Sequence, residues 1–178
     1  MQSSNPASSL TSVASSDAPI QILQKAEAAR VAAAGKPYTV GGNDTIGFDC
    51  SGFVIYVFNQ AYGTNTLADV TANELRTQGR FPAVQAPPKP GDLVFFSASA
   101  GGTTASHAAI VVDANRWISS QSSTGVAYVQ FSNPYWHPRI LSYGRYQPLQ
   151  AANAIIPMFS GKFASMMHPA GRGGLRRV

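Results

Sequence analysis

The chain has 178 residues, of which 44% are hydrophobic and 12% are charged, and its net charge at pH 7 is +5. This size suits one domain with a full core and modest extensions, and the single cysteine, Cys50, excludes an internal disulfide. Residues 148–178 hold four basic residues and no acid, which leaves nine basic residues against eight acids in residues 1–147. A nearly neutral main part argues against a nucleic-acid-binding domain.

The N-terminal part of the chain is predicted to be a flexible leader over residues 1–19, because Ser and Ala dominate it. It lacks the basic start and apolar run of a secretory signal, and no segment has the roughly 18 continuous apolar residues of a membrane span. From Ile20 to about Ala34 the sequence predicts an alanine-rich helix that Gly35 ends. The folded domain is therefore expected over residues 20–147, followed by a basic C-terminal extension over residues 148–178.

The second expected helix carries the cysteine. Apolar residues follow Cys50 at steps of three and four until Gly63, and Asp49 precedes the helix as its N-cap. A thiol in the first turn meets unpaired backbone N–H groups and the positive end of the helix dipole, and both favour the thiolate. The alternative is a small buried hydrophobic residue, which is the commoner role of a lone cysteine.

The remainder of the domain is predicted to be mostly β-structure. A helical turn over residues 71–78 begins with Thr71 and Glu74 in the pattern of a capping box, and the proline-rich stretch 82–90 is expected to be a connecting loop. Five strands are predicted at 93–96, 107–112, 116–121, 126–131 and 139–146. Strands joined by short turns form an antiparallel meander, and helices precede them, so the expected class is α+β with helices on one face of the sheet.

A cysteine nucleophile needs a base within hydrogen-bond reach and a polar group that orients this base. Of the three histidines, His107 opens a strand, where a side chain can face a helix start, whereas His137 lies in an aromatic turn and His168 in the C-terminal extension. His107 is therefore the preferred base. Ser119 and Gln121 are the candidates for orienting it, because residues two apart on the adjacent strand share one face.

Four motifs follow one another along residues 30–147. They are Pro37-Tyr38 with Gly41-Gly42, Phe48-Asp49-Cys50-Ser51-Gly52-Phe53, Pro90-Gly91-Asp92-Leu93-Val94-Phe95-Phe96, and Ser106-His107-Ala108-Ala109-Ile110-Val111-Val112. Together they resemble the NlpC/p60 family of papain-like cell-wall cysteine peptidases. The resemblance implies a papain-like α+β fold in which the nucleophile helix packs on a five- or six-stranded antiparallel sheet.

The resemblance also implies roles for individual residues. Cys50 matches the nucleophile, His107 the base and Tyr38 a tyrosine near the oxyanion, with neither a metal nor a cofactor required. Members of the family often carry a histidine as the orienting residue, and this position is Ser119 here. Because other members use Asn or Gln, Gln121 is preferred over Ser119 for this role, with His137 as a fallback. Residues expected to line the substrate or oxyanion site are Tyr38, Ser51 and Ser119.

The activity implied by the resemblance is hydrolysis of peptidoglycan stem peptides, commonly at the D-γ-glutamyl to diaminopimelate bond. A protein delivered to the periplasm or cell wall would suit this activity, either as an antibacterial effector with a cognate immunity protein, as a phage lysin, or as a housekeeping hydrolase. Two other functions stay open: an amidase or acyltransferase with the same Cys-His pair, and an inactive peptidoglycan-binding module. Nucleic-acid binding would depend only on the basic extension, so no nucleic-acid partner is expected.

Overall fold

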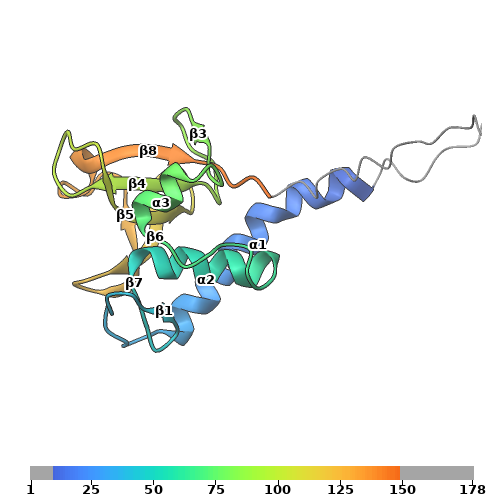
Figure 1. Cartoon of the computed structure of the whole chain (residues 1–178), viewed down its shortest axis with the longest axis horizontal. Coiled ribbons are helices and arrows are strands. Elements are labelled where there is room, and N and C mark those ends of the chain that lie inside the picture. The colour runs from blue at the N-terminus through green and yellow to red at the C-terminus, as the bar shows by residue number, and fades with distance from the viewer. Residues whose placement is uncertain (1–9, 149–178) are drawn as a thin grey trace, which may run out of the picture. The chain divides into compact units, whose positions relative to one another are not determined.

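The computed structural model describes residues 10–148, with side chains from Asp17 onward (Figure 1). The basic extension expected over residues 148–178 lies outside the described residues except for Pro148, as does His168. Residues 1–9 of the expected leader also lie outside them.

Three α-helices are present in the described residues: α1 (Leu10–Ala32), α2 (Cys50–Tyr62) and α3 (Ala72–Thr77). A short 3-10 helix, η2 (His137–Arg139), precedes the last strand. Helix α1 begins well before Ile20, so the prediction of a flexible leader up to residue 19 is wrong for residues 10–19. From Ala18 onward the helix is supported by tertiary packing, which supplies most helical stability in proteins. Pro19 and Ile22 line a cavity of about 310 Å³ together with Gly91, so this part of the helix rests on the loop before the first long strand.

The main sheet has six strands in the order β3-β8-β4-β5-β6-β7, and the paired neighbours are antiparallel. The strands are β3 (Ala83–Val84), β4 (Leu93–Ser97), β5 (Ala105–Val111), β6 (Arg116–Gln121), β7 (Gly125–Gln130) and β8 (Ile140–Gly144). The sheet confirms the predicted α+β class. Strands β4 to β7 form the predicted meander, but β8 returns to pair with β4, because residues 131–139 are long enough to carry the chain back across the sheet.

Two short pairings were missed by the sequence analysis. Strand β3 lies inside the proline-rich stretch expected to be a loop, and β1 (Asn43–Asp44) pairs with β2 (Gly47–Phe48) just before the cysteine helix. Strands of two residues show no alternation of polar and apolar side chains, which is the signal that sequence analysis uses. Their pairing is decided by the partner strand, which for β3 is β8.

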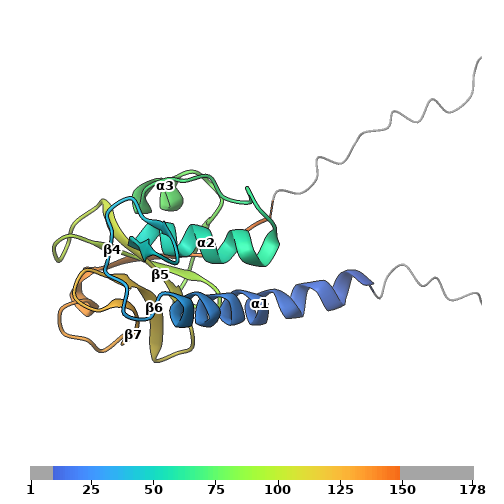
Figure 2. The ribbon, with the colours of Figure 1, turned by 90° about the horizontal axis from the view of Figure 1, so that it is seen from below.

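The sheet separates two groups of buried apolar side chains. The larger group joins the helices to one face of the sheet, and includes Ile22, Ala26, Phe53, Phe58, Leu75, Leu93, Phe95, Ile110 and Ile118. Figure 2 shows α1 and α2 running alongside each other. The smaller group, called the second cluster below, consists of Val94, Phe96, Ala109, Val111 and Trp117, and Trp136 and Ile140 pack against it. The segment that leads to β8 thus covers the second cluster.

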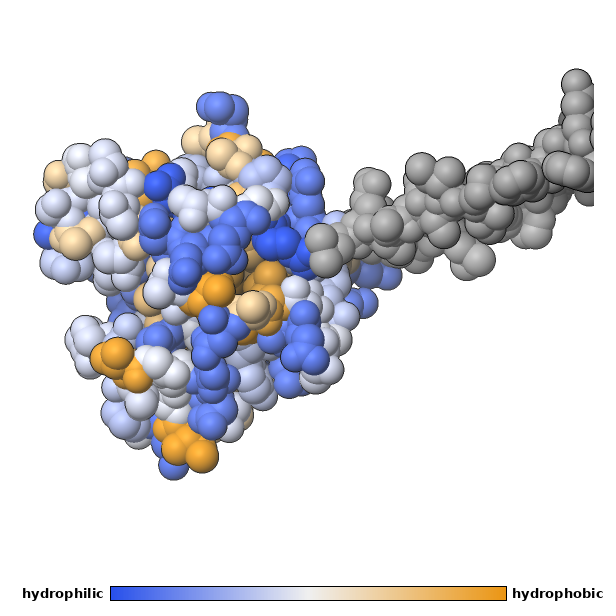
Figure 3. All heavy atoms as spheres, in the orientation of Figure 1, coloured by the Kyte–Doolittle hydropathy of each residue, from blue (hydrophilic) through white to orange (hydrophobic). Residues whose placement is uncertain are grey.

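The protein surface is mainly polar on the face shown in Figure 3, where hydrophobic residues occur in separate patches. Among the side chains that the structure describes, Val40 and Ile46 are the most exposed large apolar ones, at 88% and 74%, in the segment before α2. Among the described residues, none of the helices combines the length and the apolar character needed to cross a membrane.

Candidate active site

The start of α2 is fixed by the side chain of Asp49, as the sequence predicts. Its Oδ1 accepts hydrogen bonds from the backbone N–H of Gly52 at 2.6 Å and from the Ser51 hydroxyl at 2.9 Å. Its Oδ2 accepts from the backbone N–H of Gly41 at 2.9 Å, which belongs to the preceding loop. Asp49 therefore caps the helix and ties the loop to it, and Ser51 has a structural contact rather than a free hydroxyl.

The loop before α2 approaches the helix so closely that only glycine fits. A Cβ atom on Gly52 would lie 2.0 Å from the carbonyl oxygen of Gly42, and one on Gly42 would lie 2.0 Å from that of Gly47. Backbone atoms cannot give way by such an amount, so both glycines are required by packing. This close approach holds the segment that carries Tyr38 beside the first turn of α2.

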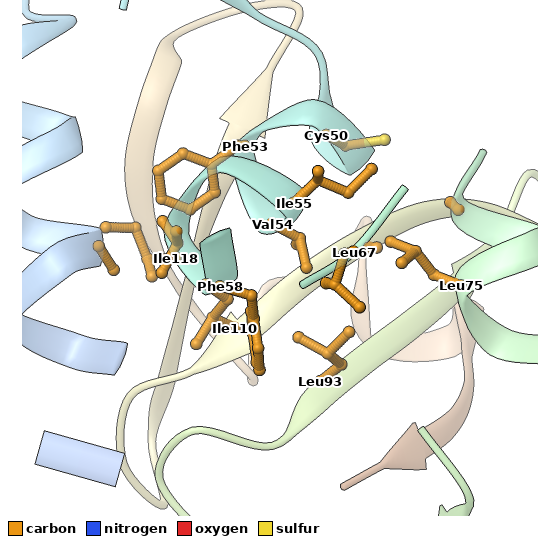
Figure 4. Packing of buried hydrophobic residues seen from close by; sticks show 14 of the residues in the cluster. Cys50, Phe53, Val54, Ile55, Phe58, Leu67, Leu75, Leu93, Ile110 and Ile118 are labelled. Atoms are coloured by element: carbon orange, nitrogen blue, oxygen red, sulfur yellow. The ribbon is translucent and has the colours of Figure 1, made fainter. Parts of the chain in front are cut away.

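The thiol of Cys50 lies at the N-terminal end of α2, and its sulfur is directed away from the core residue Phe53 (Figure 4). The residue is only 5% exposed. Its Sγ is 3.9 Å from the carbonyl oxygen of Ser106 and receives hydrogen bonds from the backbone of Ala108 and the hydroxyl of Tyr38. Ser106 and Ala108 precede and follow His107 on β5, so the structure brings the thiol to the strand that carries the predicted base.

Burial raises the pKa of the Cys50 thiol above its ordinary value, although hydrogen bonds from Ala108 and Tyr38 act in the opposite direction. Burial thus opposes the preference for the thiolate that the helix start creates. Desolvation likewise raises the pKa of Tyr38 to about 12. The Tyr38 hydroxyl contacts both the thiol and the backbone N–H of Cys50.

A β-bulge places His107 at the end of the sheet. His107 pairs with Phe96, but the next pair joins Ser97 to Ala105, so Ser106 has no partner. The extra residue bends β5 and turns the Ser106 carbonyl towards the thiol. The start of β5 is held by α3, because the Asn73 side chain accepts a hydrogen bond from the Ala105 N–H at 3.1 Å.

The ring of His107 is surrounded by aromatic side chains. It stacks on Trp136, with centroids 4.5 Å apart and planes at 28°, and it contacts Phe96 and Trp117 at 5.9 and 6.0 Å. Burial lowers its pKa from 6.5 to about 4, and the charge of Asp49 opposes this shift. Its Nε2 is buried without a hydrogen-bond partner among the described residues. The imidazole is therefore neutral at pH 7 and is held by ring packing.

The candidates for orienting His107 hydrogen-bond to other groups. The Ser119 hydroxyl donates to the carbonyl oxygen of Ala108 at 2.7 Å, and His137 is exposed, with its Nδ1 3.1 Å from the carbonyl oxygen of Phe131. Gln121 is buried, and its Oε1 accepts a hydrogen bond at 3.2 Å from Nε1 of Trp136. Gln121 thus contacts the indole that stacks on His107.

Trp136 is the neighbour of His107 that sequence reasoning missed. Its neighbours in the 133–138 turn identify an aromatic turn, but nothing in the spacing shows that the turn folds back onto His107. Its backbone N–H and that of Tyr135 donate to the Asn133 side chain, at 3.2 and 2.9 Å, which fixes the turn. No group of three or more His, Cys, Asp or Glu suited to hold a metal occurs among the described residues.

Comparisons with known proteins identify the family of this chain. The model of the NlpC/P60 family matches residues 35–145. The chain is 36% identical over 114 residues to the Bacillus subtilis protein named "Probable peptidoglycan endopeptidase LytE", a match that covers 63% of this chain and 31% of LytE. It is 38% identical over 116 residues to the γ-DL-glutamyl hydrolase of Bacillus subtilis, covering 65% of this chain and 27% of the hydrolase.

A solved structure shows the same fold. The crystal structure of an NlpC/P60 family protein from Bacillus cereus matches with a TM-score of 0.56 at 26% identity, over 65% of this chain and 37% of that chain. These matches span about a third or less of the length of the two curated relatives and somewhat more of the solved chain. The similarity is therefore confined to one domain of longer proteins.

Proposed function

Because this chain belongs to the NlpC/P60 family, we propose that it is a peptidoglycan hydrolase that cleaves stem peptides with a cysteine nucleophile. The observation that carries the proposal is the convergence at the start of α2 of the Cys50 thiol, the Tyr38 hydroxyl and the backbone on either side of His107. The names of the curated relatives, a peptidoglycan endopeptidase and a γ-DL-glutamyl hydrolase, support an endopeptidase that acts at a γ-glutamyl bond. We propose the D-γ-glutamyl to diaminopimelate bond as the one that is cut.

The proposed mechanism begins from a neutral pair, since burial raises the pKa of Cys50 and lowers that of His107. As the sulfur attacks the scissile carbonyl, the thiol proton passes to His107, and the backbone N–H of Cys50 and the Tyr38 hydroxyl stabilise the oxyanion. The imidazolium then protonates the leaving amine, which breaks the amide bond and leaves a thioester. Water, deprotonated by His107, hydrolyses the thioester and regenerates the thiol.

We propose Gln121 for the third role, acting through Trp136. The Gln121 amide accepts the indole N–H, and the indole face holds the imidazole, so Gln121 is a positioning residue in this scheme. Ser119 and His137 are the weaker candidates, because each is engaged with a backbone carbonyl. Ser51 supports the site by binding Asp49.

Replacement of the nucleophile tests the proposal. Cys50→Ala is expected to lower the release of cleaved muropeptides by more than about 10³-fold, because a nucleophile and its base act as a unit. Mass spectrometry of digested peptidoglycan measures the products and names the bond that is cut. Circular dichroism and the unfolding midpoint serve as the control for folding, and undiminished hydrolysis by a folded Cys50→Ala protein would refute the proposal. Products in which an added amine has captured the acyl group would instead indicate an acyltransferase.

One observation favours a second candidate, a binding module without activity: the buried Nε2 of His107 has no hydrogen-bond partner among the described residues. Alkylation of Cys50 with iodoacetamide in the presence and absence of purified stem peptide separates the two. An active site predicts alkylation that the peptide slows and that His107→Ala lowers, because the base removes the thiol proton. A binding module predicts alkylation that is insensitive to His107→Ala.

For the biological context we propose delivery to the periplasm or cell wall, as an antibacterial effector or a lysin, and an effector would require a cognate immunity protein. The proposal of delivery follows from the proposed substrate, because peptidoglycan lies outside the cytoplasm. Expression with a fused export signal should arrest growth, whereas cytoplasmic expression should not. Equal growth in both cases, with both proteins present at similar levels, would argue against an effector.

A further inference from the structure

A second cavity adjoins the candidate active site. It has a volume of about 470 Å³, which is in the range of ligand pockets. It is lined by residues 121–124, by three residues of β7 and by Asn133, Tyr135 and Trp136. Trp136 is shared between the two sites: it lines this cavity and stacks on His107 at 4.5 Å. The indole of Trp136 would therefore separate an occupant of the cavity from His107.

The chemistry of the lining indicates the class of the occupant. No residue that lines the cavity carries a charge at pH 7, and the polar groups are hydroxyls of Ser and Thr and amides of Asn and Gln. A zwitterionic or acidic peptide segment would lose water here without gaining an opposite charge, which is costly. Hydroxyls and amides beside aromatic rings instead suit an uncharged ligand that has many hydroxyl or amide groups and apolar C–H faces, which is the chemistry of an N-acetylated sugar.

The aromatic part of the cavity is held rigid in advance. Tyr135 and Trp136 meet at 87° with centroids 5.0 Å apart, and Asn133 accepts both of their backbone N–H groups. The guanidinium of Arg139 lies 3.9 Å from the Tyr135 centroid, which supports that ring. Tyr135 is 55% exposed. Side chains fixed before binding lower the entropic cost of binding.

We propose that this cavity is a glycan subsite that binds an N-acetylated sugar of the peptidoglycan strand while the attached stem peptide lies at Cys50. The inference rests on the proposed function, since it takes the stem peptide as substrate. Three observations support it: the lining has no charged residue, Tyr135 and Trp136 are fixed by their contacts, and Trp136 lies between the cavity and His107. The enzyme would then prefer peptides that are still attached to glycan over free peptides.

A comparison of two substrates tests the subsite. The ratio of kcat/KM for a disaccharide stem peptide to that for the same peptide without the disaccharide is expected to be about three to ten in the unaltered protein, the size of one aromatic contact. Tyr135→Ala should bring this ratio close to one, Tyr135→Phe should keep it because the ring remains, and Gln130→Ala, on the exposed side of β7, should keep it as a matched control. A ratio of one in the unaltered protein, or a ratio unchanged by Tyr135→Ala, would overturn the proposal.

Direct binding separates this inference from the proposed function. Chitotetraose, which has no peptide, should shift the backbone amide NMR signals of residues 121–124 and 133–136, and Tyr135→Ala should weaken the binding. If neither substrate is cleaved but chitotetraose shifts these signals, the endopeptidase is refuted and the sugar site is supported. If the peptides are cleaved but chitotetraose leaves these signals unmoved at millimolar concentration, the sugar site is refuted and the endopeptidase is supported.

Discussion

The nucleophile and the base are held in place by different interactions. Around Cys50, hydrogen bonds dominate: both carboxylate oxygens of Asp49 accept from groups in the first turn of α2 and in the preceding loop. Around His107, ring contacts dominate, and its Nε2 lacks a hydrogen-bond partner in the described part of the chain. The comparison teaches that the first half of the site is encoded within a dozen residues, whereas the second half depends on a turn about thirty residues away in sequence.

Among the effects that distinguish the surroundings of His107 from those of Cys50, the largest expected is the pH dependence of stability that His107 produces. Its pKa is about 4 in the folded protein and 6.5 as an ordinary value, so the unfolded state binds more protons between these pH values. Stability should therefore be intact above pH 6.5 and fall by roughly 3 kcal/mol as pH drops to 4. Urea unfolding at several pH values measures this.

Two variants sharpen that measurement. His107→Gln should remove most of the fall in stability, because no proton can be taken up at this position, whereas His137→Gln should leave it in place because His137 is exposed. Identical pH dependence in the His107→Gln protein and the unaltered protein would mean that ring packing does not keep this imidazole neutral.

The next effect concerns only the aromatic surroundings of His107. Trp136→Ala removes the ring stacked on His107 and is expected to lower kcat about 10- to 100-fold, because the base loses its position. The pKa of His107 should also rise towards 6.5 as water enters, so the acidic limb of the rate profile should move to higher pH. Trp136→Phe keeps a ring and should show a smaller loss. An unmoved acidic limb for a folded Trp136→Ala protein would contradict the role given to the indole.

The hydrogen bonds around Cys50 are tested by substitutions of Asp49. Asp49→Ala removes the helix cap and the tie to Gly41, and should lower the free energy of unfolding by about 1–2 kcal/mol. Asp49→Asn retains one acceptor oxygen, so it can cap the helix while losing the bond to Gly41, and its loss should be about half as large. Urea denaturation provides the values, and equal losses for the two variants would show that the loop tie contributes nothing.

The smallest effect separates Gln121 from Ser119, the two candidates on strand β6, for the role of orienting His107. Gln121→Ala releases the indole N–H of Trp136 and is expected to lower kcat about three- to tenfold with little change in KM. Ser119→Ala removes a hydroxyl that binds only backbone carbonyls and should lower kcat less. Steady-state kinetics on a purified stem peptide compares them, and a larger loss for Ser119→Ala would reverse the assignment.

Much of the fold follows from local sequence. The period of the apolar residues after Cys50 predicts α2, the Thr71 and Glu74 pattern predicts the capping box observed at α3, and strand β6 occupies the predicted residues 116–121. These features are local because each depends on residues within one or two turns or on one strand. The helical conformation of residues 18–19 and strand β3 were missed because each depends on a distant partner, the loop before β4 for the helix and β8 for β3.

For the site, the sequence by itself determined the helix start with Asp49 and Cys50, and named His107 as the base to test. Only the tertiary structure shows the burial that opposes ionisation of both Cys50 and His107, because burial depends on every element packed around a group. The tertiary structure alone also brought Trp136 onto His107, since the chain crosses the sheet between β7 and β8 to do so. A spacing in sequence cannot encode such a contact, because it depends on how the segment between β7 and β8 packs over the second cluster.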